Sequence, residues 1–414
     1  MKEDLTGNAV WECELENLRE QGLLRIMPAM AGVPGKELSV NGRRAINFSS
    51  NNYLGLAGHP ALIEGSQEYT ARYGSGATAS RLIAGNTQAH RELEEVLAEW
   101  KGTPAALLFG SGYQANVGIL SSVMGENDLI ISDELNHASI IDGCRLSPSA
   151  VMVYPHRDLN GLADLVKLNG FNRKLVVTES VFSMDGHKAP LREISELCRR
   201  WGALLMVDEA HATGVFGPDG QGLAAAEGIV PDVQMGTLGK AMGSAGAYVA
   251  GSRALIDLLI NKARSLIFTT ASPAGVIGSA LAALRIVASE EGSRRRAALA
   301  ENVSRFRELL RRATGCDTNP GHIVPIMIGD SAQTMKISQS CLEAGIFAHG
   351  IRFPSVPEGT GRLRFSLMSI HTPEDLVIAA SVLERVLHAH SMHQEQSQRT
   401  DGLPARSKDT KRTA

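Results

Sequence analysis

Two polar residues with chemical potential, Asp208 and His211, follow the apolar run Leu204–Val207 at the spacing of a strand and the turn after it. A carboxylate at a strand end can hold a positively charged ring nitrogen, or it can cap the next helix. The letters Asp-Glu-Ala-His also spell the metal-binding box of certain nucleotide-driven helicases. The pair alone therefore leaves an electron-poor ring, a structural cap and a DEAH-type ATPase open.

Lys240 lies among small residues in Gly236-Thr-Leu-Gly-Lys-Ala-Met-Gly243, after another apolar run. Such a lysine is either solvated or placed to form an imine, with Thr237 available to a phosphate oxygen. The order of acid, histidine and lysine after successive strands favours an imine with pyridoxal phosphate (PLP). A helicase phosphate loop needs Ser or Thr after the lysine, where this chain has Ala241, and has to precede the acid.

Three weaker signals follow other apolar runs. Ser111, Gly112 and Tyr113 lie between a strand and a helix start, where free backbone N–H groups bind anions. His137 has a ring that could stack on a flat cofactor, and Ser183 has a hydroxyl that could bond a cofactor oxygen. A structural histidine and a helix cap are the alternatives, and only the shared order of the signals favours a site.

These residues need a sheet to bring them together. Seven short apolar runs alternate with helical stretches such as Thr87–Trp100 and Leu191–Trp201, which predicts a mainly parallel seven-stranded sheet between helices. Ligands of such sheets lie at the carboxyl ends of the strands. The runs are Ala105–Phe109, Leu129–Ser132, Val151–Tyr154, Leu175–Thr178, Leu204–Val207, Val233–Met235 and Ala247–Ala250.

We expect four segments along the 414 residues. Residues 1–45 form an N-terminal helix, over about 11–25, and an arm. Residues 46–285 form the large domain, and residues 286–390 form a smaller α+β domain with a helix over Ser293–Ala313 and strands at Ile323–Ile328 and Arg362–Leu367. Residues 391–414 are polar with few large apolar groups, which predicts a disordered tail.

Composition excludes several classes of function. Hydrophobic residues are 43%, charged residues are 21% and the net charge is -3, so we expect no nucleic-acid or anionic-membrane partner. The five scattered cysteines form no C-x-x-C pair, which argues against a metal site and for a reducing compartment. The first residues lack the apolar core of a signal peptide, so we expect a cytoplasmic protein.

The combined motifs resemble the α-oxoamine synthases of PLP fold type I, from about residue 15 to about residue 388. This family joins an amino acid to an acyl thioester with loss of CO2. The matching stretches are Asn47-Phe-Ser-Ser-Asn-Asn-Tyr-Leu-Gly-Leu56, Ser111-Gly-Tyr113, Leu135-Asn-His-Ala-Ser139, Val181-Phe-Ser-Met-Asp-Gly186, Val207-Asp-Glu-Ala-His211 and Gly236-Thr-Leu-Gly-Lys240.

The resemblance implies a role for each matching residue. Lys240 holds PLP and acts as the base on the amino acid, Asp208 pairs with the ring nitrogen, and His137 stacks on the ring and helps to bind the substrate. His211 and Ser183 bond the phenolic oxygen of the ring. The implied phosphate-edge residues are Ser111, Gly112, Tyr113, Thr237 and, from a partner subunit, Thr269 and Thr270. The active site would then belong to a homodimer.

On the substrate side the resemblance implies that Arg364 grips the amino acid carboxylate, while Arg25, Asn51 and Ser355 contact the substrate or the acyl carrier. The segment Gly350-Ile-Arg-Phe-Pro-Ser-Val-Pro-Glu-Gly-Thr360 most resembles members that join L-alanine to pimeloyl-CoA, or to pimeloyl carrier protein, in biotin synthesis. It departs from them at Phe353 and Ser355, where Pro and Thr are common, and Asn52 is often Asp there. Members that join glycine to acetyl-CoA, or another amino acid to another acyl-CoA, are the alternative.

Overall fold

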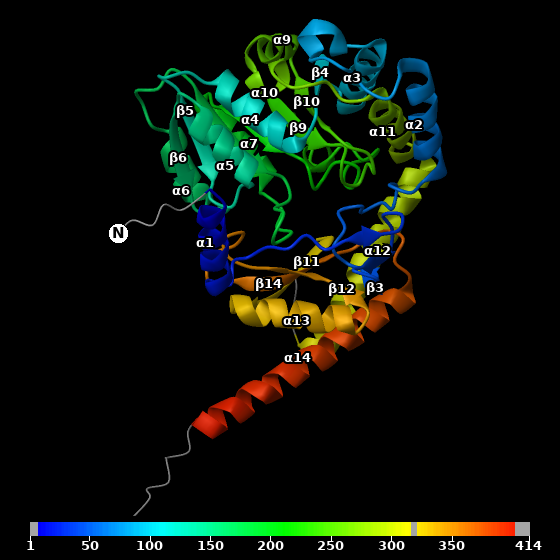
Figure 1. The fold of residues 1–414 in the computed structure, drawn as a ribbon. Coiled ribbons are helices and arrows are strands. Elements are labelled where there is room, and N and C mark those ends of the chain that lie inside the picture. Colours follow the sequence, from blue (N-terminus) through cyan, green and yellow to red (C-terminus); the bar gives the residue numbers. More distant parts are fainter. Residues whose placement is uncertain (1–6, 316–320, 402–414) are drawn as a thin grey trace, which may run out of the picture.

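The protein, seen in a computed structural model that describes residues 7–315 and 321–401, consists of a large sheet packed between helices and a smaller unit beside it (Figure 1). The seven predicted strands are all present and form one sheet of order β4-β10-β9-β8-β7-β5-β6. Only β10 runs antiparallel to its neighbours, so the prediction of a mainly parallel sheet is confirmed. The strands are β4 (Ala105–Phe109), β5 (Leu129–Asp133), β6 (Ala150–Tyr154), β7 (Lys174–Glu179), β8 (Leu204–Asp208), β9 (Val233–Thr237) and β10 (Ala247–Gly251).

Both faces of this sheet are covered, because alternate side chains of each strand pack into different apolar clusters. In β4, Ala106 and Leu108 pack on one side while Leu107 and Phe109 pack on the other. One cluster includes α4 (Gly112–Val123), α5 (Ala138–Leu146), α9 (Arg253–Lys262) and α10 (Arg264–Ile267). The other includes α2 (Pro60–Tyr73), α3 (Gln88–Lys101), α6 (Leu159–Val166), α7 (Leu191–Trp201), the short α8 (Leu223–Ala226) and α11 (Ala274–Val287).

Local sequence signals place the helix starts that border the site. The side chain of Ser111 accepts a hydrogen bond from the backbone N–H of Gln114 and so caps α4, and His137 caps α5 by accepting from Ser139. These two caps lie just past β4 and β5, at the carboxyl edge of the sheet. Both helices therefore begin beside the predicted site.

The C-terminal unit is a three-stranded antiparallel sheet of order β11-β14-β13 with helices around it. The long helix α12 runs between the two bodies in Figure 1, and α14 extends away from them. The predicted strands and the predicted Arg-rich helix in this region are confirmed. The elements are α12 (Glu290–Thr314), β11 (Ile323–Gly329), α13 (Ser331–Glu343), β12 (Ile346–Phe347), β13 (His349–Ile351), β14 (Gly361–Ser366) and α14 (Pro373–Asp401).

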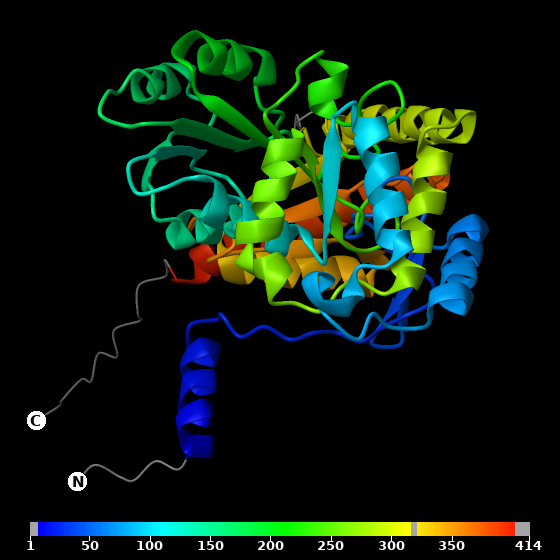
Figure 2. The same cartoon turned by 90° about the horizontal axis from the view of Figure 1, so that it is seen from above.

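The N-terminal region differs from expectation in that it contains strands. After α1 (Gly7–Glu20) come β1 (Met30–Ala31), β2 (Glu37–Val40) and β3 (Arg43–Asn47), and β3 pairs in parallel with β12 of the C-terminal unit. Helix α1 has no buried residue and projects from the body in Figure 2. The helix ends earlier than predicted, because Gly22 has a φ of 67°.

The C-terminal prediction also differs from the structure. Helix α14 continues to Asp401, whereas we expected disorder from residue 391. Its last segment contains Gln, Glu, His and Met but no Gly or Pro, so helix propensity suffices where an apolar stripe is missing. Residues 402–414 of the predicted tail lie outside the described residues, and among the described helices none is long and apolar enough to cross a membrane.

Candidate active site

At the carboxyl edge of the large sheet, three adjacent strands each end in a residue with an acidic or hydroxyl side chain. Glu179 ends β7, Asp208 ends β8 and Thr237 ends β9, and Glu179 pairs directly with Asp208 in the register of the two strands. Glu179 is 2% exposed and Asp208 is 4% exposed. Two carboxyl groups so close together in a dry place disfavour two negative charges, and the pKa of Glu179 rises well above its ordinary value through burial and the Asp208 charge.

Lys240 reaches the same place from the turn after β9. Its Nζ lies 2.9 Å from Nε2 of His211. Burial lowers the pKa of Lys240 to about 8, although the charges of Asp208 and Glu179 act in the opposite direction. The amine of Lys240 is therefore neutral in a sizeable fraction of molecules near pH 8, which a nucleophilic or basic lysine requires.

The turn that carries Lys240 depends on two glycines. A Cβ on Gly236 would lie 2.4 Å from the hydroxyl of Tyr248, and a Cβ on Gly243 would lie 2.5 Å from the backbone nitrogen of Ala57. Gly243 also has a φ of 64° and donates its N–H to the carbonyl of Lys240. The small residues of the motif therefore pack the turn tightly beneath the amine.

Asp208 is held in place by two hydrogen-bond donors. Its Oδ2 accepts from Nδ2 of Asn116 at 2.8 Å, and its Oδ1 accepts from the N–H of Ala210 at 2.8 Å. The same Asn116 amide donates to the Oγ of Ser139, which is also 2.8 Å from Nδ1 of His137. The exposed ring of His137 is thereby linked to Asp208 through Ser139 and Asn116.

His211 joins the lysine to the other side of the site. Its Nδ1 lies 2.7 Å from the hydroxyl of Tyr53, which in turn donates to Oδ1 of Asn51 at 3.0 Å. Burial, with Lys240 adding to it, lowers the pKa of His211 well below its ordinary value, so the ring is neutral. With Nδ1 carrying the proton, His211 donates to Tyr53 and accepts from Lys240.

On the other side of the site, Arg364 connects several segments of the chain. It lies on β14, is 8% exposed, and donates from Nε to the carbonyl of Ser183 and from Nη2 to Asn51. In the described part of the chain it forms no ion pair. A buried guanidinium without a counter-charge is energetically unfavourable. An anionic ligand that paired with Arg364 would therefore stabilise the site.

Of the predicted phosphate-edge residues, Ser111, Gly112 and Tyr113 form the start of α4, while the three threonines differ in their contacts. Thr237 donates its hydroxyl to the carbonyl of Gly246, and Thr269 lies 3.4 Å from Nε2 of Gln114. Tyr113 is 50% exposed and donates to Asp142 at 2.7 Å. Thr270 is exposed and forms an isolated bridge with Ser80, so the contribution of a partner subunit stays a prediction.

Arg25 and Ser355 lie apart from this cluster. Nη2 of Arg25 donates to Oγ of Ser355 at 3.1 Å, and both residues line a cavity of about 540 Å³ between the N-terminal arm and the C-terminal unit. Of the predicted substrate contacts, the structure thus brings Asn51 and Arg364 to the lysine side and leaves Arg25 and Ser355 farther out.

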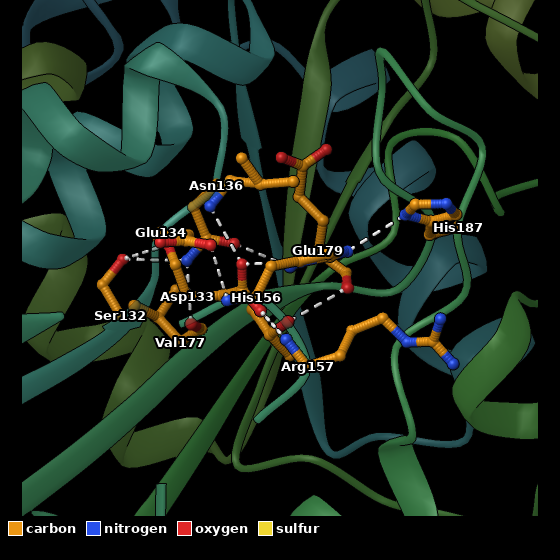
Figure 3. A network of polar contacts seen from close by, with 11 residues as sticks. Ser132, Asp133, Glu134, Asn136, His156, Arg157, Val177, Glu179 and His187 are labelled. Atoms are coloured by element: carbon orange, nitrogen blue, oxygen red, sulfur yellow. Dashed lines mark hydrogen bonds and ion pairs between the residues drawn. The ribbon is translucent and has the colours of Figure 1, made fainter. Parts of the chain in front are cut away.

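Sequence reasoning missed Glu179, Asn116 and Tyr53 as site residues. Glu179 ends a strand as Asp208 does, so the same rule applied to every strand end would have found it. Figure 3 shows that its backbone N–H donates to Oδ1 of Asn136, whose amide also bonds Ser132 and Val177. Asn136 thereby fixes the segment that carries His137. Asn116 lies inside a helix, where no pattern marks it.

Comparisons with known proteins agree with this geometry. Residues 43–383 match the family model of the class I and II aminotransferases. Proteins named 8-amino-7-oxononanoate synthase are 49% identical in Geobacter metallireducens, over 90% of this chain and 96% of that protein, and 47% identical in Anaeromyxobacter dehalogenans, over 86% and 90%. The family match leaves the ATPase alternative without support.

Solved structures give the same answer. A serine palmitoyltransferase from Sphingomonas wittichii has a TM-score of 0.86 at 32% identity, covering 94% of this chain and 99% of that chain. An 8-amino-7-oxononanoate synthase from Francisella tularensis has a TM-score of 0.72 at 28% identity, covering 84% and 99%. The expected fold type and family are confirmed: the chain belongs to the class I and II aminotransferase family and, within it, to the α-oxoamine synthases.

Proposed function

We propose that this protein is a PLP-dependent, cytoplasmic 8-amino-7-oxononanoate synthase. It condenses L-alanine with pimeloyl-CoA, or with pimeloyl carrier protein, and releases CO2 and the free thiol of the carrier. The observation that carries the chemistry is Lys240, a buried amine with a pKa of about 8 beside Asp208 and His211. The shared name of relatives at 45–49% identity carries the choice of substrates.

The residues present fit the cofactor. Asn116 Oδ1 and Gln114 Oε1 are buried polar atoms that have no hydrogen-bond partner among the described residues, and both residues lie on α4, which starts beside Asp208 and Lys240. Such atoms are rare unless a ligand satisfies them. The N-terminus of α4 offers N–H groups to a phosphate, and the exposed ring of His137 offers a face to a flat ring.

The roles we assign follow from these positions. When bound, PLP supplies an electron sink for negative charge at Cα of the amino acid. Asp208, fixed by Asn116 and Ala210, holds a proton on the ring nitrogen, and Lys240 binds the cofactor and then moves the Cα proton. His211 and, as the family resemblance implies, Ser183 would hold the phenolic oxygen of the ring. The unpaired guanidinium of Arg364 binds the carboxylate of alanine.

We propose further that two copies of the chain form the working enzyme, with Thr269 and Thr270 facing the phosphate edge of the other copy. An exposed apolar surface near these residues supports this, since Ile83 is 82% exposed and Phe268 is 70% exposed. The segment Arg81–Gly85, which contains Ile83, contacts α10, and Phe268 and Thr269 directly follow α10. The expected domain boundaries near residues 46 and 286 stay a prediction. Sedimentation at several concentrations tests the dimer.

The assay for the function compares two substrate pairs on the purified, PLP-loaded enzyme. We expect faster release of CoA from L-alanine with pimeloyl-CoA than from glycine with acetyl-CoA, and mass spectrometry should find 8-amino-7-oxononanoate. Faster turnover of the glycine pair would make the enzyme a glycine C-acetyltransferase instead. Pimeloyl carrier protein, tested beside pimeloyl-CoA, identifies the preferred donor.

A further inference from the structure

Two buried arginines of β14 contact the same loop, which follows β7 in the chain. Arg362 and Arg364 are two residues apart on the strand, so their side chains project from the same face at a spacing of roughly 7 Å. Nε of Arg364 donates to the carbonyl of Ser183 at 2.6 Å, and Nη1 of Arg362 forms an ion pair with Oδ1 of Asp185. One short loop therefore supplies an oxygen to each arginine, a neutral one to Arg364 and a charged one to Arg362.

This loop is held close to the arginines, because its backbone packs against the start of β11. Gly186 has a φ of 68°, and a Cβ on it would lie 2.3 Å from the carbonyl oxygen of Ile323. A Cβ on Gly321 would likewise lie 2.8 Å from the carbonyl oxygen of Gly186. Asp185, next to Gly186, is thereby kept beside β14, on a segment that contacts both arginines.

The two arginines differ in their electrostatic surroundings. The charge of Arg362 is neutralised by Asp185. Arg364 donates to neutral oxygens, among them those of Ser183 and Asn51, and forms no ion pair with the described residues. In a buried region a carboxylate this near to Arg364 would compete strongly with the carboxylate of a bound ligand. The pairing of Asp185 with Arg362 removes that competitor.

We propose that Arg362 is a positioning residue: by pairing with Asp185, it keeps this carboxylate away from Arg364 and so keeps Arg364 available for the carboxylate of the amino acid substrate. The inference rests on the proposed function, in which Arg364 binds that carboxylate, and it adds a determinant of affinity that does not touch the substrate. If Asp185 occupied Arg364 in about nine molecules out of ten, the apparent dissociation constant of the amino acid would rise about tenfold.

The test measures the dissociation constant of the amino acid on the full-length, PLP-loaded enzyme. L-Alanine and glycine are each titrated against the visible band of the bound cofactor, without an acyl donor. Arg362→Met takes the cation away from Asp185 and should weaken the binding of the amino acid about tenfold. Asp185→Asn adds no competitor, so it should leave the dissociation constant within about threefold of the wild type or lower it.

Two further variants separate competition from direct contact. The double variant Arg362→Met with Asp185→Asn should restore binding to within about threefold of the wild type, because the competing carboxylate is gone. Arg362→Lys keeps a cation for Asp185 and should also stay within about threefold. In every variant kcat, measured with saturating L-alanine and pimeloyl-CoA, should change less than the dissociation constant.

Arg173→Met is the matched control for breaking an ion pair of a buried aspartate. Nη2 of Arg173 lies 2.5 Å from Oδ2 of Asp128, whose side chain is 4% exposed. These residues precede β7 and β5, so the pair lies at the amino edge of the sheet, opposite the edge that carries Asp208. The control should lower the free energy of unfolding in urea titrations, as Arg362→Met should, but leave the dissociation constant of the amino acid unchanged.

Three results would overturn the inference and leave the proposed function standing. Unchanged binding in Arg362→Met would remove any role in affinity, and equal weakening by Arg362→Met and Asp185→Asn would make the pair purely structural. A double variant as weak as Arg362→Met would mean that Arg362 binds the substrate directly. A wild type that bound glycine but not L-alanine would contradict the proposed substrate, while the glycine titrations would still test Arg362. A wild type that bound neither amino acid would overturn the proposed function and the inference with it.

Discussion

The carboxyl edge of the large sheet and the region around Arg364 are built in opposite ways. At the sheet edge, Glu179 and Asp208 end consecutive strands and are buried, Lys240 follows the next strand and is half-buried, and all three lie within one stretch of chain. The Arg364 region takes Asn51 from the N-terminal half, Ser183 from a loop after β7, and Arg364 from the C-terminal unit.

This difference separates two tasks. The sheet edge can hold a charged cofactor rigidly, because its backbone positions are set by the hydrogen-bond ladders of a buried sheet. The Arg364 region joins segments more than 300 residues apart, so it can adapt to a substrate and change between relatives. We therefore expect changes at the sheet edge to abolish the chemistry, and changes in the Arg364 region to alter which substrate binds.

The largest effect should come from Lys240→Ala. This variant loses both the attachment of the cofactor and the base, so the rate of condensation should fall by about 10⁴-fold or more. The visible absorbance band of the attached cofactor should vanish with it. Lys262→Ala, at the exposed end of α9, is the control for removal of a lysine. Retained activity in Lys240→Ala would remove the lysine from the mechanism.

The variant Lys101→Met tests whether water is excluded from the region next to the sheet edge. Nζ of Lys101 lies 2.8 Å from the carboxylate of Glu209, and both side chains are 1% exposed. Removing the cation leaves the carboxylate buried and unpaired, which should lower the free energy of unfolding by about 3–5 kcal/mol in urea titrations. Arg312→Met removes the exposed pair with Glu308, which keeps its contact with Arg311, so the free energy of unfolding should hardly change. Equal costs for the two variants would contradict the picture of a dry sheet edge.

The same difference explains what could be predicted from the sequence. Strands β4 to β10 are short apolar runs, so the apolar pattern located the strands, and the polar residues that follow β8 and β9 gave Asp208, His211 and Lys240 as candidates for the site. Strands β2 and β3 form a hairpin across Asn41-Gly42, a local signal that the sequence analysis left unused. The pairing of β3 with β12 was missed because it joins segments some 300 residues apart, which leave no local pattern. Tyr53 was missed as the link to His211 for the same reason: its partner is distant in sequence.

We expect a smaller loss of activity from Asp208→Asn than from Lys240→Ala. The amide keeps the size of the side chain and removes the charge that holds the ring nitrogen protonated, so kcat should fall by roughly 100- to 1000-fold, on the scale of about 3 kcal/mol. The KM for L-alanine should change little, because Asp208 lies away from Arg364. Steady-state kinetics with saturating PLP measures both constants, and a change confined to KM would contradict the role.

The pH dependence of the cofactor-free protein tests the burial of Lys240. Its pKa is about 8 in the folded protein, against the ordinary lysine value of 10.5 in the unfolded chain, so between these values the unfolded chain binds more protons. The free energy of unfolding of the wild type, relative to Lys240→Met, should therefore rise with pH from about 8 to about 10.5, by at most about 1.4 kcal/mol per pH unit. Below pH 8 the difference should be constant. A difference that does not change with pH would mean that the amine is solvated.

The variant Arg364→Lys, for which we expect the smallest effect on the kinetic constants, tests whether the Arg364 region acts in substrate binding. Lysine keeps the positive charge but cannot form the planar fork that reaches Ser183, Asn51 and a carboxylate together. We expect the KM for L-alanine to rise about tenfold, which corresponds to about 1.4 kcal/mol, while kcat stays within a factor of about three. If kcat fell instead and KM held, Arg364 would act on the reacting atoms, and the division between a chemical sheet edge and a selective Arg364 region would be wrong.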